Sequence, residues 1–174
     1  SNLRKAMNRL LPPEIRVLSA EETVASFHPI RNAVAKTYEY RIYRSEICPP
    51  FERRYVHHYP YPLDAPHMIG LAPMIEGEHD FACFAAADKT DALGHSKVRK
   101  VFSSRFQSEA DRLIYRVRGS GFLKHMVRNI VGLMMAAGRG IVNANDVERY
   151  LSVQTQTKAG PTAPPAGLFL VSVE

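Results

Sequence analysis

The pattern of apolar positions between residues 119 and 134 predicts the helix around which the chain is organised. Beyond Gly121 the apolar side chains recur at about 100° per residue, the period of an α-helix, and do not alternate as in a strand. One side of this helix carries Phe122, Leu123, Met126, Val127, Ile130, Leu133 and Met134. An apolar stripe of this width predicts that the helix packs against a sheet.

The opposite side of the same helix gathers His125, Arg128, Asn129 and Gly132. A solvated helix face normally mixes Lys and Glu, and none of the four is of that kind. Arginine has a permanent charge and a fixed fork of donors, which suits the binding of a carboxylate or a phosphate. Two interpretations stay open: a core helix with a wet polar face, and a helix that holds Arg128 in a site.

The clearest strand is predicted at residues 34–43, where apolar and polar side chains alternate. Further strands are expected at residues 15–18, 54–59, 98–106, 113–118 and 168–173. Further helices are expected near residues 3–11, at residues 63–76 with Asp64 as the cap, and at residues 145–153. Strands in hairpin order mixed with helices favour an α+β fold, with a mainly antiparallel sheet and helices packed on one face.

The size and composition of the chain fit a folded domain that binds an anionic partner. With 174 residues, 45% of them apolar, the chain fits one domain or one half of a larger enzyme, and we expect residues 1–174 to form a single domain. Because the chain has no initiator Met ahead of its first helical pattern, we expect residues 1–33 to be a helix and a connector from a preceding half. The net charge of +6 favours an anionic partner such as RNA. The basic residues available for such a partner are Arg41, Arg44, Arg53, Arg54, Arg116, Arg118 and Lys124.

The cysteines and the hydropathy pattern indicate the compartment. Cys48 and Cys83 show neither a CxxC spacing nor a disulfide framework, which indicates a reducing, cytoplasmic location. No apolar run approaches the roughly 20 residues that a membrane span needs. We therefore expect no membrane association.

Two groups of histidine and acidic residues are candidates for chemistry. His57 and His58 are adjacent on an expected strand and point to opposite faces, so we expect no metal site there. His79 and Asp80 can be interpreted as part of a hydrolase site or as a loop cap beside buried phenylalanines. Nothing in the sequence assigns a nucleophile to this pair, so the loop cap is the preferred interpretation.

Six segments form a recognisable series when they are taken in chain order. They are KTYEYRIY (residues 36–43), PLDAPHM (62–68), GEHDFACF (77–84), VRKV (98–101), GSGFLKHMVRNIVG (119–132) and AGPTAPPAGLFLVSV (159–173). Together they resemble the C-terminal half of the TruA-type tRNA pseudouridine synthases, over nearly the whole chain. The most specific parts of the resemblance are FLKHMVRNIVG and TAPPAGLFL.

The resemblance implies an enzyme that isomerises uridine to pseudouridine in the anticodon stem-loop of tRNA, acts as a homodimer, and uses no cofactor and no metal. By matched position, Arg128 corresponds to the arginine that pairs with the catalytic aspartate. Tyr38 corresponds to the tyrosine that packs against the target uracil, and Leu168 to an apolar residue that lines the uracil pocket. Both also fit a structural role, Tyr38 as a packed sheet tyrosine and Leu168 as a core strand residue.

The family's nucleophilic aspartate lies in a motif of the type R-T-D-A-G-V-H, which these 174 residues do not contain. Residues 89–95, KTDALGH, imitate the motif at a different place in the series, and we interpret Asp91 as a solvated loop aspartate. We therefore expect half an active site, inactive alone, with Arg128 in a cleft that is open to solvent or to an anion. The alternative function is a non-catalytic RNA-binding or assembly module on the same scaffold.

Overall fold

The computed structural model describes residues 2–88, 94–152 and 158–174. The chain divides into two compact units, Ser1–Asn32 and Ala33–Glu174. The first unit contains helix α1 (Asn2–Leu10) and an irregular segment. The prediction of a strand at residues 15–18 is wrong. The side chain of Asn8 donates to the carbonyl oxygen of Val17 at 2.9 Å and accepts from its backbone N–H at 2.8 Å, so these groups do not pair with a neighbouring strand.

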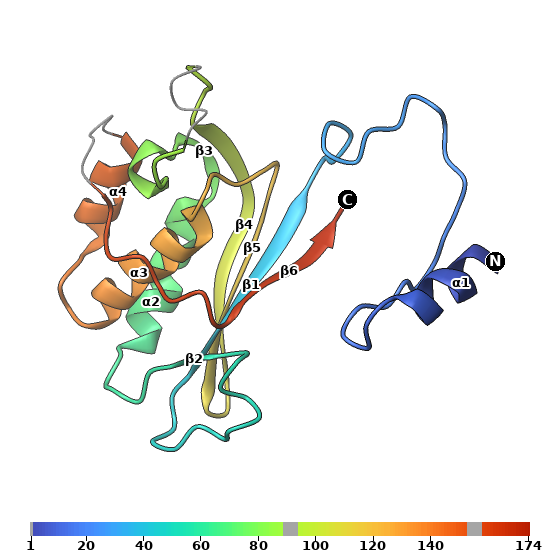
Figure 1. The fold of residues 1–174 in the computed structure, drawn as a ribbon. Coiled ribbons are helices and arrows are strands. Elements are labelled where there is room, and N and C mark those ends of the chain that lie inside the picture. The colour runs from blue at the N-terminus through green and yellow to red at the C-terminus, as the bar shows by residue number, and fades with distance from the viewer. Residues whose placement is uncertain (1, 89–93, 153–157) are drawn as a thin grey trace. The chain divides into compact units, whose positions relative to one another are not determined.

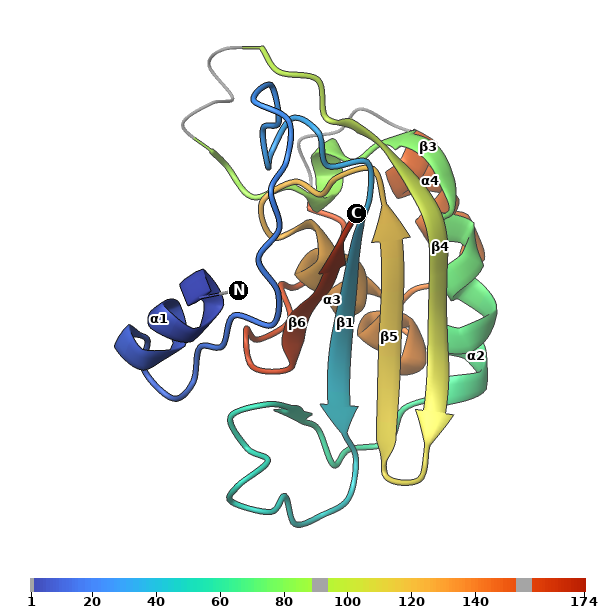
Figure 2. The same cartoon turned by 90° about the vertical axis from the view of Figure 1, so that its right-hand side faces the viewer.

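The second unit is built on a mostly antiparallel sheet, shown in Figures 1 and 2. Within the described residues its strands are β1 (Lys36–Tyr43), β2 (His57–His58), β3 (Gly77–Asp80), β4 (Val98–Glu109), β5 (Arg112–Gly119) and β6 (Leu168–Val173). The strand order is β2-β1-β5-β4-β3, and β6 also pairs with β1. Only the short β1–β2 pair is parallel among these strands. The α+β prediction is confirmed.

Three helices lie against one face of this sheet, and Figure 2 looks onto the other face. They are α2 (Ala65–Leu71), α3 (Met126–Gly138) and α4 (Ala144–Ser152). Alternate side chains of β1 and β5 point toward them, so that Tyr40 and Ile42 lie opposite Tyr115 and Leu113 and are fully buried. The helices contribute apolar side chains to the same core, among them Met68, Ile130, Leu133 and Met134.

Helix α3 begins later and is buried more completely than its sequence pattern predicts. Phe122 and Leu123 precede the helix, because His125 adopts a left-handed conformation with φ of 63° and the helix starts after it. Arg128 is the one residue of α3 that is not buried. The interpretation of a wet polar face is therefore wrong for Asn129 and Gly132, which are buried under residues 159–163, whereas His125 is exposed and Arg128 is half-buried. A Cβ atom on Gly132 would stand 1.7 Å from the carbonyl oxygen of Pro161.

The remaining elements depart from the predictions mainly at their ends. The helix expected at residues 63–76 is α2, capped by Asp64, followed by a 3₁₀ turn at Ala72–Ile75. The strand expected at residues 54–59 is reduced to β2, and β4 and β5 meet at a tight turn where Ala110 has φ of 49°. None of the helices in the described part of the chain is long and apolar enough to cross a membrane.

Candidate functional site

The structure brings Tyr38, Arg128 and Leu168 together in one pocket of about 340 Å³. Tyr38 comes from β1, Arg128 from the first turn of α3, and Leu168 from the start of β6. Because β6 pairs with β1, Leu168 lies beside the strand that carries Tyr38. The rest of the lining is Phe122, Leu123, Lys124, His125, Met126, Val127 and Pro165.

The turn between β5 and α3 forms one wall of the pocket. Phe122, expected on the buried stripe of the helix, instead meets the ring of Tyr38 edge to face, with the centroids 5.2 Å apart and the planes at 82°. This contact restrains the plane of the Tyr38 ring. Lys124 and His125 are exposed at the rim, and the left-handed backbone of His125 is a conformation that residues other than glycine seldom adopt.

Arg128 is held by the segment that leads into β6. Its Nε–H donates to the carbonyl oxygen of Ala163 at 2.6 Å, and the backbone N–H of Ala163 donates in return to the carbonyl oxygen of Arg128 at 3.1 Å. Among the described residues no carboxylate lies within 4.0 Å of its guanidinium. The geometry orients the charge and leaves the other four N–H donors of the guanidinium for an anion.

Residues 159–167 form a strap across the polar side of α3, and buried polar groups fix it there. Asn129 donates through Nδ2 to the carbonyl oxygen of Phe84 at 2.6 Å, and its Oδ1 accepts from the hydroxyl of Thr162 at 2.6 Å. The hydroxyl of Tyr40 donates to the carbonyl oxygen of Pro164 at 2.8 Å. Burial raises the pKa of Tyr40, against a smaller lowering by the charge of Arg128, so this hydroxyl stays a donor.

The sequence placed Asn129 on the polar side of the helix but could not supply its partners, which lie 45 and 33 residues away along the chain. The one local signal for this role was the amide side chain of Asn129 in a helix that is otherwise mostly apolar. A buried amide needs partners for its donors and its acceptor, and here it joins two loops. We therefore interpret Asn129 as the residue that keeps the strap, and with it Ala163, in place.

Replacing Asn129 with leucine is expected to lower the free energy of unfolding by about 1–3 kcal/mol, because the Phe84 carbonyl and the Thr162 hydroxyl lose their buried partner. Thr162→Val removes one of the same bonds, so the double variant should lose less than the sum of the two single losses. Denaturant titration measures all three values. The matched control is Asn145→Leu on the exposed side of α4, expected within about 0.5 kcal/mol of the wild type. Equal stability of the Asn129 variant and the wild type would contradict this role.

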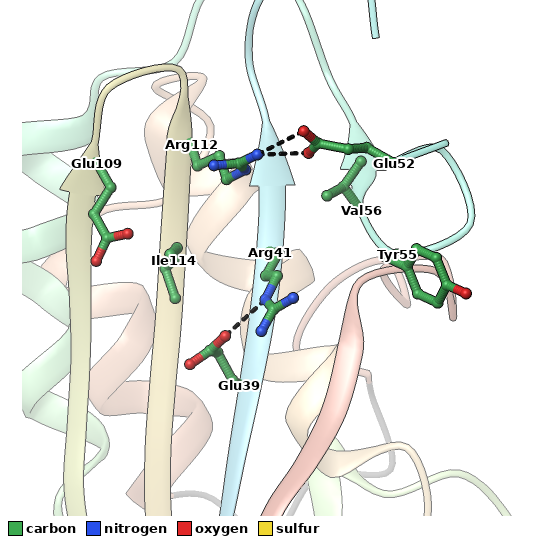
Figure 3. Close-up of a pocket in the computed structure, with 8 residues that line it drawn as sticks. All are labelled: Glu39, Arg41, Glu52, Tyr55, Val56, Glu109, Arg112 and Ile114. Carbon is green, nitrogen blue, oxygen red and sulfur yellow. Dashed lines mark hydrogen bonds and ion pairs between the residues drawn. The ribbon is translucent and has the colours of Figure 1, made fainter. Parts of the chain in front are cut away.

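A larger pocket, of about 490 Å³, lies on the uncovered face of the sheet and is shown in Figure 3. Arg112 binds both oxygens of Glu52, at 2.7 Å and 2.6 Å, and Arg41 binds Glu39 at 2.7 Å. Hydrogen bonding to Glu52 raises the pKa of Arg112. Arg41 and Arg112 are thus both paired with glutamates, so this pocket attracts an anion less strongly than the pocket at Arg128 does.

The other sequence candidates do not form a site. Asp80 accepts from the backbone N–H of Ala82 at 2.9 Å and His79 binds the carbonyl oxygen of Glu76 at 2.9 Å, so the loop-cap interpretation is confirmed. Asp91 lies outside the described residues. Among the described residues no group of three or more His, Cys, Asp or Glu side chains could hold a metal ion.

Comparison with known proteins places the chain among RNA-modifying enzymes. The family model described as tRNA pseudouridine synthase matches residues 71–174. The tRNA pseudouridine synthase A of Solibacter usitatus is 59% identical over 174 residues, which are 99% of this chain and 69% of that protein. The tRNA pseudouridine synthase A of Bacillus pumilus is 40% identical over 168 residues, 97% of this chain and 67% of that protein.

Proposed function

Because this chain belongs to the tRNA pseudouridine synthase family, we propose that it supplies the uracil pocket and the arginine of an active site that isomerises uridine to pseudouridine in tRNA. The observation that carries the proposal is the meeting of Tyr38, Arg128 and Leu168 in one pocket. These residues were assigned from three separate segments of the sequence, and in the fold they line one pocket together with both apolar and basic side chains.

The reaction exchanges one bond between base and sugar for another. The N1–C1′ bond breaks, the uracil turns, and a C5–C1′ bond forms, while C5 loses a proton and N1 gains one, so no atom is added or removed overall. The target uridine must leave its stack, at a cost of a few kcal/mol. In the proposal the ring of Tyr38 and the side chain of Leu168 receive the uracil and offset part of that cost.

Arg128 is proposed to hold the carboxylate that acts on the ribose or the base. Its hydrogen bond to Ala163 uses one donor, and the remaining donors can bind a carboxylate through two parallel hydrogen bonds, the geometry that arginine favours. We propose that this carboxylate comes from outside the 174 residues, since the R-T-D-A-G-V-H type of motif is not among them. The chain spans 69% of the Solibacter relative and 67% of the Bacillus one, which leaves room for it.

The finer expectations remain proposals. We propose the anticodon stem-loop of tRNA as the substrate, a homodimer as the working form, and the cytoplasm, where tRNA is available, as the location. The reaction as proposed needs no cofactor and no metal, because it neither oxidises nor hydrolyses the nucleoside. The excess of basic over acidic residues, 23 to 17, supports an RNA partner.

The test uses the intact protein that contains this chain and tRNA carrying tritium at C5 of its uridines. Formation of the C5–C1′ bond expels the label, and the expected result is time-dependent release of tritium into water. The 174-residue chain alone is expected to release none. An intact protein that binds the tRNA and releases no tritium would instead support the non-catalytic RNA-binding module.

A further inference from the structure

A third pocket lies at the opposite end of α3 from Arg128. It is shallow, has a volume of about 610 Å³, and is lined by Arg44, Tyr59, Tyr61, Pro62, Leu63, Asp64, Gly138 and Arg139. Arg139 follows Arg128 by eleven positions, which at 1.5 Å per residue separates their backbones by about 17 Å along the helix axis. The combination of two tyrosines and two arginines is unusual for a surface hollow and calls for an explanation.

The tyrosines belong to a row of rings that runs from the core to the surface. Tyr40 meets His57 at 6.1 Å between centroids, His57 meets Tyr59 at 5.8 Å, and Tyr59 meets Tyr61 at 5.3 Å, all edge to face. Tyr40 is fully buried, whereas Tyr61 is 65% exposed. The row therefore restrains its outermost ring from behind and leaves much of that ring free to stack with another flat group.

The arginines of this pocket lack carboxylate partners. Arg139 is exposed, and within the described residues its side chain makes neither an ion pair nor a hydrogen bond. The guanidinium of Arg44 donates to the carbonyl oxygen of Leu63 at 3.2 Å, and its buried Nε has no hydrogen-bond partner among the residues that the structure describes. By contrast, each arginine that lies along the uncovered sheet face has a glutamate within 4.0 Å; these are Arg41, Arg105, Arg112, Arg116 and Arg118.

The guanidinium of Arg139 is not bound to the last carbonyl groups of α3. A cation near a helix C-terminus can serve to satisfy the last carbonyl groups. Here backbone N–H groups satisfy them: Asp64 donates to Gly138 at 2.8 Å, Gly140 to Ala137 at 2.8 Å, and Ile141 to Ala136 at 3.0 Å. The carboxylate of Asp64, the one acid in the lining, is occupied as the cap of α2. The guanidinium of Arg139 is therefore free for an external anion.

A smaller cavity of about 170 Å³ connects this pocket to the strap. It shares Tyr59 and Arg139 with the pocket, and its other walls include residues 161–164 of the strap. His57 also lines it, with a buried Nδ1 that finds no hydrogen-bond partner in the described parts of the chain. The pocket at Arg139, this cavity and the pocket at Arg128 thus follow one another along the strap, an arrangement that suits an extended ligand.

We propose that Arg44, Tyr59, Tyr61 and Arg139 bind a nucleotide of the same RNA strand that carries the target uridine, with its base stacked on Tyr61 and its phosphate at Arg139. This inference rests on the proposed function, because it places a second contact for that substrate. A separation of about 17 Å corresponds to roughly five stacked nucleotides at 3.4 Å each. The contact adds affinity and fixes the register of the strand, and it takes no part in the bond changes.

Binding of fluorescently labelled substrate tRNA to the intact protein, followed by anisotropy, tests the proposal. Tyr61→Ala is expected to weaken binding at least about fivefold, the lower limit for one stacked base, and Tyr61→Phe to stay within about twofold because it keeps the ring. Arg139→Gln should reduce the slope of log Kd against log salt by about 0.7–0.9, the loss of one phosphate contact. At saturating tRNA each variant should release tritium at the wild-type rate, so the defect appears in KM.

The chain offers matched controls for both substitutions. Tyr55→Ala removes a tyrosine that is 56% exposed, and Arg149→Gln removes one exposed charge on α4; both should bind tRNA as the wild type does. Melting temperatures show whether any variant is misfolded. Wild-type affinity and salt slope in folded Tyr61→Ala and Arg139→Gln overturn the inference, as do equal losses in the controls. A wild-type protein that releases no tritium refutes the proposed function instead, whatever the variants bind.

Discussion

Substituting alanine for Arg128 in the intact protein is expected to lower kcat/KM for pseudouridine formation about 150- to 4,000-fold. Losing one partner of a close charge pair costs about 3–5 kcal/mol, mostly because the remaining charge is left unpaired, and each 1.4 kcal/mol is tenfold in rate. Arg128→Lys keeps the charge but loses the fork and the bond to Ala163, so its loss should be intermediate. Tritium release at varied tRNA concentration measures these effects.

Arg105→Ala is the matched control for Arg128. It also removes one arginine, but from the exposed sheet face, where its nearest glutamate oxygen lies 4.0 Å away. We expect activity within about twofold of the wild type and a melting temperature close to it, since pairs of this kind contribute little. Retention of more than a tenth of the wild-type activity by a folded Arg128→Ala protein would refute the proposed role.

Gly132→Ala is expected to be strongly destabilising, lowering the free energy of unfolding by about 3 kcal/mol or more. The new Cβ would stand 1.7 Å from the carbonyl oxygen of Pro161 and 2.9 Å from its carbonyl carbon. Because those atoms are backbone, either the strap or the helix must move, which costs more than adjusting a side chain. Displacing the strap also moves Ala163, so folded molecules should show reduced activity.

A second helical glycine provides the control. Gly70 lies in α2, and a Cβ there meets nothing within 4 Å. Gly70→Ala should therefore stabilise the protein by about 0.5–1 kcal/mol, the ordinary gain of alanine over glycine inside a helix. If the close approach of the strap is the cause, thermal and denaturant unfolding should show a lower free energy of unfolding than the wild type for Gly132→Ala and a higher one for Gly70→Ala. If both variants were destabilised, the close approach of the strap would not be the cause of the effect at Gly132.

Much of the fold follows from local pattern. Alternation predicts β1 and β5 to within two residues, and β6 at its observed bounds, because burial on one face repeats every second residue. The start of α3 was missed because Phe122 and Leu123 keep the helical spacing while the backbone at His125 does not. Periodicity reports which side chains are buried, and it does not report where a chain turns.

The candidate site was predicted only in part, for a different reason. The resemblance to known sequences supplied Tyr38 and Leu168, which a pattern of polar and apolar positions alone would have left as packing residues. It also gave a role to Arg128, which the polar side of the expected helix had already singled out. The bonds that place Arg128 join positions 35 residues apart, and the bond from Tyr40 to Pro164 spans 124. No local signal encodes such contacts, so the strap over α3 and the row of rings behind Tyr61 emerge from the structure alone.

The reciprocal bonds between Arg128 and Ala163 also bear on when the site comes into being during synthesis. Helix α3 can form soon after residue 138 leaves the ribosome, but the carbonyl that orients Arg128 is added 25 residues later, in the strap that Asn129 and Tyr40 hold in place. A nascent chain that has not emerged beyond residue 164 thus carries the arginine without its orientation. The chemistry proposed for this pocket therefore has to wait until the strap and Leu168 have been made.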